Sequence, residues 1–140
     1  MEHPATGGRR SDLVVDSAER RQHLKQSVER LIERLGGINV EHLDISEYTK
    51  GYLGNHLSRL KVALHRPAYL LRHTVCDHPK PIETQRFVDY GGGPGLMTLL
   101  AAEMDVGEVV YNDIYDVSCE DIQAVADAAG LSISSIVEGD

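Results

Sequence analysis

Residues 86–100, RFVDYGGGPGLMTLL, decide how we interpret the fold of this chain. The first five residues form a short apolar run typical of a buried strand, and the residues from Leu96 onward have the apolar spacing of a helix. A cluster of glycines lies between them, at positions 91, 92, 93 and 95. Because glycine lacks a Cβ, such a cluster allows a sharp turn and a close approach to a ligand. The stretch therefore predicts a strand, a tight loop and a helix.

The same alternation continues to the end of the chain. We expect further strands over residues 108–112 and 134–137, and helices over residues 96–104 and 122–129, the second closed by Gly130. The connections between them are short. Strands and helices that alternate in this way predict an α/β fold with a parallel sheet covered by helices.

Residues 11–80 are expected to be helical. A first helix should run from about Asp16 or Ser17 to Leu35, ending at the glycine pair 36–37. Its apolar side chains recur at spacings of three and four, which places them on one face: Leu24, Val28, Leu31 and Leu35. Residues 1–10 contain Pro, two Gly and two Arg with nothing to bury, so we expect a disordered lead-in.

A second helical stretch is expected over residues 46–75. It should begin at Ser46, and Pro67 should kink or break it near Arg66. Residues 77–81, DHPKP, cannot continue a helix and are predicted to be a linker. The apolar positions of this stretch are Leu53, Leu57, Leu60, Leu64, Ala68, Leu71 and Val75.

The charge of the chain is divided unequally. The 140 residues carry a net charge of −8, but residues 1–80 hold 13 basic and 10 acidic side chains together with all seven histidines. Residues 81–140 hold one basic side chain, Arg86, and 12 acidic ones. We do not expect such a chain to bind nucleic acid, because contacts to phosphates need Lys and Arg.

The sequence also limits the class of protein. The length fits one domain, and we find no apolar run long enough to span a bilayer and no apolar core of a signal peptide. Two cysteines, Cys76 and Cys119, do not make a disulfide scaffold. We therefore expect a cytoplasmic protein that does not bind membranes.

Two acidic residues end the first two expected strands. Asp89 precedes the glycine loop, and Asp113 ends the second strand. In nucleotide-binding sheets, an acid at the end of the second strand accepts hydrogen bonds from ribose hydroxyls. A strand before the loop, a helix after it and an acid at this distance together indicate a ligand site.

The identity of the ligand depends on the glycine spacing. A dinucleotide fingerprint, Gly-x-Gly-x-x-Gly, read from Gly91 would need glycine where the chain has Leu96. A P-loop is excluded because no Gly-Lys-Ser/Thr follows. Instead glycine recurs at every second position after Asp89, at 91, 93 and 95. An NAD(P)-type or flavin oxidoreductase built on the same unit remains an alternative.

This spacing resembles motif I of the class I S-adenosylmethionine-dependent methyltransferases, an acidic residue followed by Gly-x-Gly-x-Gly. Residues 109–114, VVYNDI, look like the second strand of that family, with Asp113 in the place of the ribose-binding acid. Residues 137–140, VEGD, are similar to the end of its third strand. The resemblance implies a Rossmann-like fold and transfer of a methyl group from S-adenosyl-L-methionine to an acceptor, most simply a small molecule.

The resemblance also implies a role for each matching residue. Asp89 would anchor the loop and the amino group of the cofactor, and Asp113 would bind the ribose. Asp140 would contact the adenine amine. Residues 11–80 would form a helical cap over the active site. The loop beside the methionine moiety would be shaped by Gly91, Gly93 and Gly95, and the adenine would be flanked by Ile114 or Tyr115.

The chain departs from the family in its extent. The family has seven strands, and the loop after the fourth usually carries catalytic residues, so no catalytic residue is predicted. We expect residues 81–140 to be the cofactor-binding half of a longer enzyme. The open edge of the first strand, with Phe87 and Val88, should favour self-association. The alternative is a non-catalytic partner subunit or a remnant of a methyltransferase.

The remaining candidate residues have simpler explanations. His73, Cys76 and His78 lack the fourth ligand of a structural zinc site, so no metal is predicted. His56 and His65 are interpreted as polar-face or pocket residues rather than proton acceptors.

Two tyrosines and a second cysteine are interpreted in the same way. Tyr48 and Tyr52 are expected to be an aromatic pair at the edge of the core rather than residues that close over a cofactor. Cys119 has no neighbouring base in the sequence, so a catalytic thiol is not expected.

Overall fold

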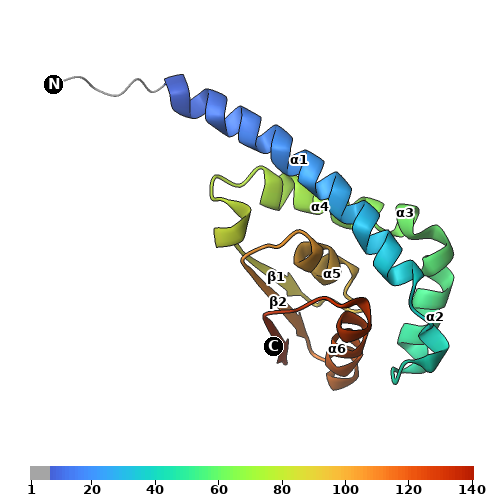
Figure 1. Cartoon of the computed structure of the whole chain (residues 1–140). Coiled ribbons are helices and arrows are strands. Elements are labelled where there is room, and N and C mark those ends of the chain that lie inside the picture. Colours follow the sequence, from blue (N-terminus) through green and yellow to red (C-terminus); the bar gives the residue numbers. More distant parts are fainter. Residues whose placement is uncertain (1–6) are drawn as a thin grey trace.

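A three-stranded parallel sheet occupies the C-terminal part of the chain, which confirms the α/β class (Figure 1). The computed structural model describes the backbone of residues 7–140 and the side chains of residues 17–140. The strands β1 (Arg86–Tyr90), β2 (Glu108–Asp113) and β3 (Ser135–Glu138) lie in the order β1-β2-β3, all parallel. Helices α5 (Leu96–Glu103) and α6 (Asp116–Ala129) connect them. The range of α5 is close to the predicted one, whereas α6 begins six residues before the predicted start at residue 122.

The two faces of the sheet differ in their burial. On one face Phe87, Tyr111 and Ile136 pack with side chains of α5 and α6 into the core. On the other face Val88 is 50% exposed and Tyr90 73% exposed. The prediction that residues 86–90 form a buried strand was therefore wrong in burial, although the strand itself is present. β1 is an edge strand whose alternate side chains point to opposite faces, and those on the Val88 side are exposed, although Val110 of the central strand is buried on that side.

Helix α1 is longer than predicted. It spans Gly7–Gly36 and ends at the predicted glycine pair. Its start lies before Asp16 because residues 9–35 contain neither Gly nor Pro, so nothing breaks the helix. Residues 7–10, predicted as part of a disordered lead-in, thus belong to α1, and residues 1–6 lie outside the described part of the chain.

The second helical stretch is more broken than predicted. Ser46 caps α2 as expected, and its hydroxyl oxygen accepts a hydrogen bond from the Thr49 amide. The interruption before Pro67 falls at Leu64, not Arg66, because Pro67 lies in the first turn of α4, where a missing N–H removes no helical hydrogen bond. The segments are α2 (Glu47–His56), a 3-10 turn (Leu57–Arg59), α3 (Leu60–Ala63), α4 (His65–Leu71) and a π-helical turn (Arg72–Cys76).

One hydrophobic core joins the helical region to the sheet. Figure 1 shows α1 crossing above α4 and α5. The leucines of its predicted apolar face are buried, and Val28 is partly buried. None of the described helices combines the length and apolar character needed to cross a bilayer. The core side chains without solvent exposure include Leu31, Leu35, Leu64, Leu71, Leu99 and Leu100.

A buried carboxylate fastens α1 to α5. Glu103, whose side chain is 4% exposed, lies 2.9 Å from Nε of Arg30 and 2.6 Å from Nε of Arg34. Arg34 also donates a hydrogen bond to the Ala129 carbonyl at the end of α6. Since a buried charge is costly unless it is paired, the two arginines are needed to keep Glu103 at this position.

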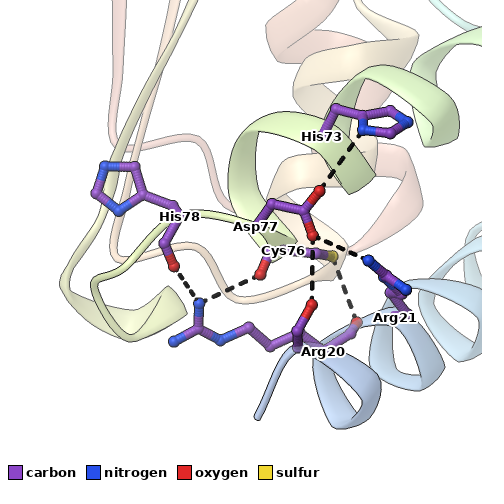
Figure 2. A network of polar contacts seen from close by, with 7 residues as sticks. Arg20, Arg21, His73, Cys76, Asp77 and His78 are labelled. Atoms are coloured by element: carbon purple, nitrogen blue, oxygen red, sulfur yellow. Dashed lines mark hydrogen bonds and ion pairs between the residues drawn. The ribbon is translucent and has the colours of Figure 1, made fainter. Parts of the chain in front are cut away.

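A second set of polar contacts holds α1 against the segment that leads into the sheet (Figure 2). The guanidinium of the buried Arg20 donates hydrogen bonds to the carbonyls of Cys76 and His78. Asp77 accepts a hydrogen bond from Arg21, 3.4 Å away. The linker predicted at residues 77–81 is therefore fixed by contacts to α1.

The Cys76 thiol belongs to the same set of contacts. Its Sγ is buried and donates a hydrogen bond to the carbonyl of Arg20. Burial raises the pKa of Cys76 from 9.0 to about 11. The folded state therefore favours the neutral thiol.

The double variant Arg30→Ala/Arg34→Ala should lower the free energy of unfolding by about 3 kcal/mol, because it leaves the Glu103 carboxylate buried without a partner. Urea titration followed by circular dichroism measures this. Adding Glu103→Leu should recover most of the loss. A triple variant as unstable as the double variant would show that the ion pairs do not fasten the two helices.

Cys76 should make folding sensitive to alkaline pH. Its contribution to stability is fully present below the unfolded pKa of about 9 and is lost as the pH rises toward its folded pKa of about 11. The free energy of unfolding of the Cys76→Ala variant should therefore fall less steeply than that of the native chain between pH 9 and 11. Parallel slopes in the two proteins would contradict this expectation.

Candidate functional site

Three segments meet at the carboxyl end of the sheet, and Asp113 is the residue that they share. One carboxylate oxygen of Asp113 accepts a hydrogen bond from the Gly93 amide at 2.9 Å, and the other accepts one from the Tyr115 amide at 3.0 Å. The Asp113 carbonyl accepts a third from the Gly139 amide at 2.9 Å. The segments that follow β1, β2 and β3 are thereby held together.

The glycine loop has the conformation that its composition predicts. Gly91, Gly93 and Gly95 have positive φ angles of 66°, 54° and 84°, a region that other residues seldom adopt. A Cβ built on Gly91 or Gly93 would have no atom within 4 Å, so the space beside these two residues is open. The loop therefore presents backbone to an open space, as close contact with a ligand requires.

At two positions of the loop, glycine is required because a Cβ would clash with a packed side chain. A Cβ on Gly92 would lie 2.4 Å from the ring of Tyr111, and one on Gly95 would lie 2.1 Å from Cδ1 of Ile122. Gly92 has no part in the predicted motif, yet only glycine fits between the loop and the central strand. Gly95 meets both requirements, because it combines a positive φ with close packing.

Tyr111 is a site residue that the sequence reasoning missed. It lies in the centre of β2 without solvent exposure, and its hydroxyl donates a hydrogen bond to the Gly93 carbonyl. Burial, with a further contribution from the charge of Asp113, raises the pKa of Tyr111 above its usual range. Its position two residues before Asp113, on the same face of the strand, was the available signal.

Asp89 is anchored in a different way from Asp113. It lies at the penultimate position of β1, and its carboxylate accepts a hydrogen bond at 2.7 Å from the hydroxyl of Thr98, in the first turn of α5. Thr98 was also missed, although it lies only three residues after Gly95 in the sequence. Asp89 therefore couples the strand before the loop to the helix after it.

Asp113 is only 6% exposed, but its hydrogen-bonding capacity is not exhausted. A carboxylate offers about four acceptor positions, and the Gly93 and Tyr115 amides use two of them. One position on each oxygen is left for two further donors. This is the number that a ribose with two neighbouring hydroxyls supplies.

The other predicted residues lie at the rim of this site. Ile114 is 54% exposed and Tyr115 is 65% exposed, directly after β2. Asp140 is exposed and follows Gly139, whose carbonyl accepts a hydrogen bond from the side chain of Asn112. Asn112 also binds the Val137 carbonyl, so this amide, absent from the prediction, holds the end of β3 in place.

The candidates in the helical region have structural roles. Tyr52 is half-buried and stacks on His56 with ring centroids 4.0 Å apart. Tyr48 is 71% exposed, so the expectation of a tyrosine pair at the edge of the core was wrong for Tyr48. α2 is tied to α6 because the Asp121 carboxylate accepts hydrogen bonds from the hydroxyls of Ser46 and Thr49.

The cysteines and histidines of the described chain show no metal-binding arrangement. His73 lies 3.5 Å from Asp77, whereas Cys76 faces the Arg20 carbonyl. Within residues 17–140, no three side chains of the ligating types His, Cys, Asp and Glu are grouped so that they could hold a metal ion. Cys119 is buried, and its thiol lies against the Asp113 carbonyl.

Comparisons with known proteins identified no relative of this chain. No protein-family model matches the chain, and no curated protein or solved structure is significantly similar to it. The geometry of the site and the motif spacing are therefore the features that bear on the function of this chain.

Gly95→Ala should destabilise the chain by about 3 kcal/mol, because the new Cβ meets Ile122 and the residue is held at positive φ. Gly91→Ala, with a positive φ but open space around it, should cost only about 1 kcal/mol. Chemical denaturation measures both variants. Ile122→Val removes the clashing methyl group and should recover part of the loss caused by Gly95→Ala. If Ile122→Val gave no recovery, the contact with Ile122 would not be the cause of the lost stability.

Proposed function

We propose that this chain binds S-adenosyl-L-methionine at the carboxyl end of its sheet and belongs to a methyltransferase that transfers a methyl group to a small-molecule acceptor. One observation carries the proposal: the segments after all three strands converge on Asp113 beside the open space over Gly91 and Gly93. The strand order, with β2 between β1 and β3, agrees with one half of a Rossmann-like sheet.

The residues present fit the parts of the cofactor. The two unused acceptor positions on Asp113 match the two ribose hydroxyls. Ile114 and Tyr115 expose apolar surface next to Asp113, where an adenine ring would lie. Asp140, beyond β3, is an acceptor for the exocyclic amine of adenine. Gly93 leaves backbone and open space for the methionine moiety.

The electrostatic character of this region supports the same ligand. Residues 81–140 carry one basic and 12 acidic side chains. S-adenosyl-L-methionine supplies a methyl group on a positively charged sulfonium sulfur, and a surrounding negative charge favours such a cation. Asp89 and Asp113 are the acids nearest the loop, and both are held by hydrogen bonds to groups of the site.

In this proposal, the site catalyses the reaction by positioning the two reacting groups. Methyl transfer is an in-line displacement, so a site that holds the acceptor and the methyl carbon in line lowers the barrier without a covalent intermediate. The chain contributes the fixed loop between Asp89 and Thr98 and the closely packed Tyr111 beneath it. We assign no proton acceptor to the described residues.

A nicotinamide dinucleotide is the second candidate ligand, because Asp113 would bind its ribose equally well. The loop favours S-adenosyl-L-methionine, since Leu96 occupies the third glycine position of the dinucleotide fingerprint and is buried. The two ligands are distinguished by calorimetric titration of the full chain with S-adenosylhomocysteine and, separately, with NADH. Saturable binding of the first alone is expected. Binding of NADH alone would overturn the proposal, and a folded chain that binds neither would indicate a partner subunit.

Asp113→Ala should weaken the binding of S-adenosylhomocysteine by about 1–3 kcal/mol, through loss of charge-assisted hydrogen bonds to the ribose. Glu120→Ala removes an exposed acid from α6 and is the matched control, which should leave the affinity unchanged. Isothermal titration calorimetry gives both affinities, and circular dichroism shows whether each variant is folded. Equal affinities for Asp113→Ala and the native chain would place the ligand elsewhere.

A further inference from the structure

A groove between α1 and the α3–α4 region lies apart from the proposed cofactor site. It has a volume of about 530 Å³. Its apolar lining residues, which we call the floor, are Leu24, Val28 and Ile32 from α1, and Ala68 from α4. Val28 and Ile32 are only partly buried, so apolar surface remains accessible to water here. Exposed apolar surface framed by polar residues is typical of an interaction site.

The walls of the groove are basic although the chain as a whole is acidic. Cations line both sides, whereas Glu29 is the one acidic residue among the lining residues. The whole chain has a net charge of −8. A basic groove on an acidic protein attracts a partner whose surface is acidic. The basic lining residues are Arg21, Lys25, Lys61, His65 and Arg72.

The shape of the groove suits a helix. Its α1 wall extends from Arg21 to Ile32, which corresponds to about 16 Å of helix, or three turns. The apolar side chains lie between α1 and α4, and the ridge of another helix fits into a groove between two helices. Tyr69, 61% exposed, stands at the rim and offers an aromatic contact of the kind found at the centres of protein interfaces.

We propose that this groove docks an acidic amphipathic helix of a partner protein, with apolar side chains on the floor and carboxylates facing Lys25, Lys61 and Arg72. The mode is that of a helix in a groove, with apolar anchors at every third or fourth position. The chain's own acidic helix α6 is a poorer occupant, because Val117 is the only large apolar side chain that the described structure exposes on it. This inference is independent of the proposed methyltransferase function.

The test uses the full chain and a synthetic probe. The probe is a fluorescein-labelled helical peptide of about 15 residues, with leucine at every third or fourth position and glutamate on both flanks of that stripe. The control peptide carries lysine in place of glutamate. Fluorescence anisotropy should show saturable binding of the acidic peptide alone. Absence of saturable binding, or equal binding of the two peptides, would overturn the proposal.

Two sets of variants locate the binding. Lys25→Glu/Lys61→Glu should weaken binding at least about tenfold, because both reversed charges face the groove. Arg59→Glu/Lys80→Glu makes the same change in net charge at exposed positions outside the groove lining and should leave the affinity within about threefold. Equal weakening in both would mean that net charge, not the groove, attracts the peptide.

Tyr69→Ala tests contact without changing charge. It should weaken binding about fivefold or more, and the exposed position of Tyr69 means that folding is not at risk. Unchanged affinity would count against a docked helix.

Sedimentation with phosphatidylserine vesicles and light scattering of the chain alone complete the test. Binding to vesicles would overturn the proposal and show that the groove contacts a membrane. Self-association that Lys25→Glu/Lys61→Glu abolishes would overturn it and show that the groove binds a second copy of the chain.

Discussion

The packing of the leucine face of α1 against the rest of the chain is the contact on which this structure depends. A three-stranded sheet with two connecting helices has little apolar surface to bury by itself. Leu31 and Leu35 supply it, because they are fully buried in the same core as Leu99 and Leu100 of α5. The helical region thus shares one hydrophobic core with the sheet and its connecting helices.

The polar contacts at this junction set the direction in which α1 lies. The Glu103 carboxylate forms ion pairs with two arginines from successive turns of α1, and the Arg20 guanidinium donates hydrogen bonds to carbonyls at the start of the linker. Apolar packing alone allows a helix to slide or rotate, whereas paired charges and directed hydrogen bonds permit one arrangement. The strand that carries Asp89 begins a few residues after this junction, so the placement of α1 and that of the glycine loop are linked.

The sequence was sufficient to predict what is local and periodic. The strands, the helices between them and the glycine loop follow from alternation and spacing, and Asp113 was found because chain order fixes its place at the end of β2. The sequence pattern could not predict features that depend on contacts between residues distant in the chain. Tyr111 beneath Gly92 is a contact between strand and loop. The exposure of Val88 depends on which face of the sheet is covered, and the interruptions between α2 and α4 depend on how short helices fit the core.

The sheet face that carries Val88, Tyr90 and Val137 has a thermodynamic consequence. These side chains are 47–73% exposed in the folded state, so much of their apolar surface is hydrated before unfolding begins. The heat capacity change of unfolding arises from newly hydrated apolar surface. For this chain it should fall below the roughly 12–15 cal/mol/K per residue of ordinary domains, which flattens the curve of stability against temperature. Cold would then destabilise the fold less than it destabilises a protein of the same length with a fully covered sheet.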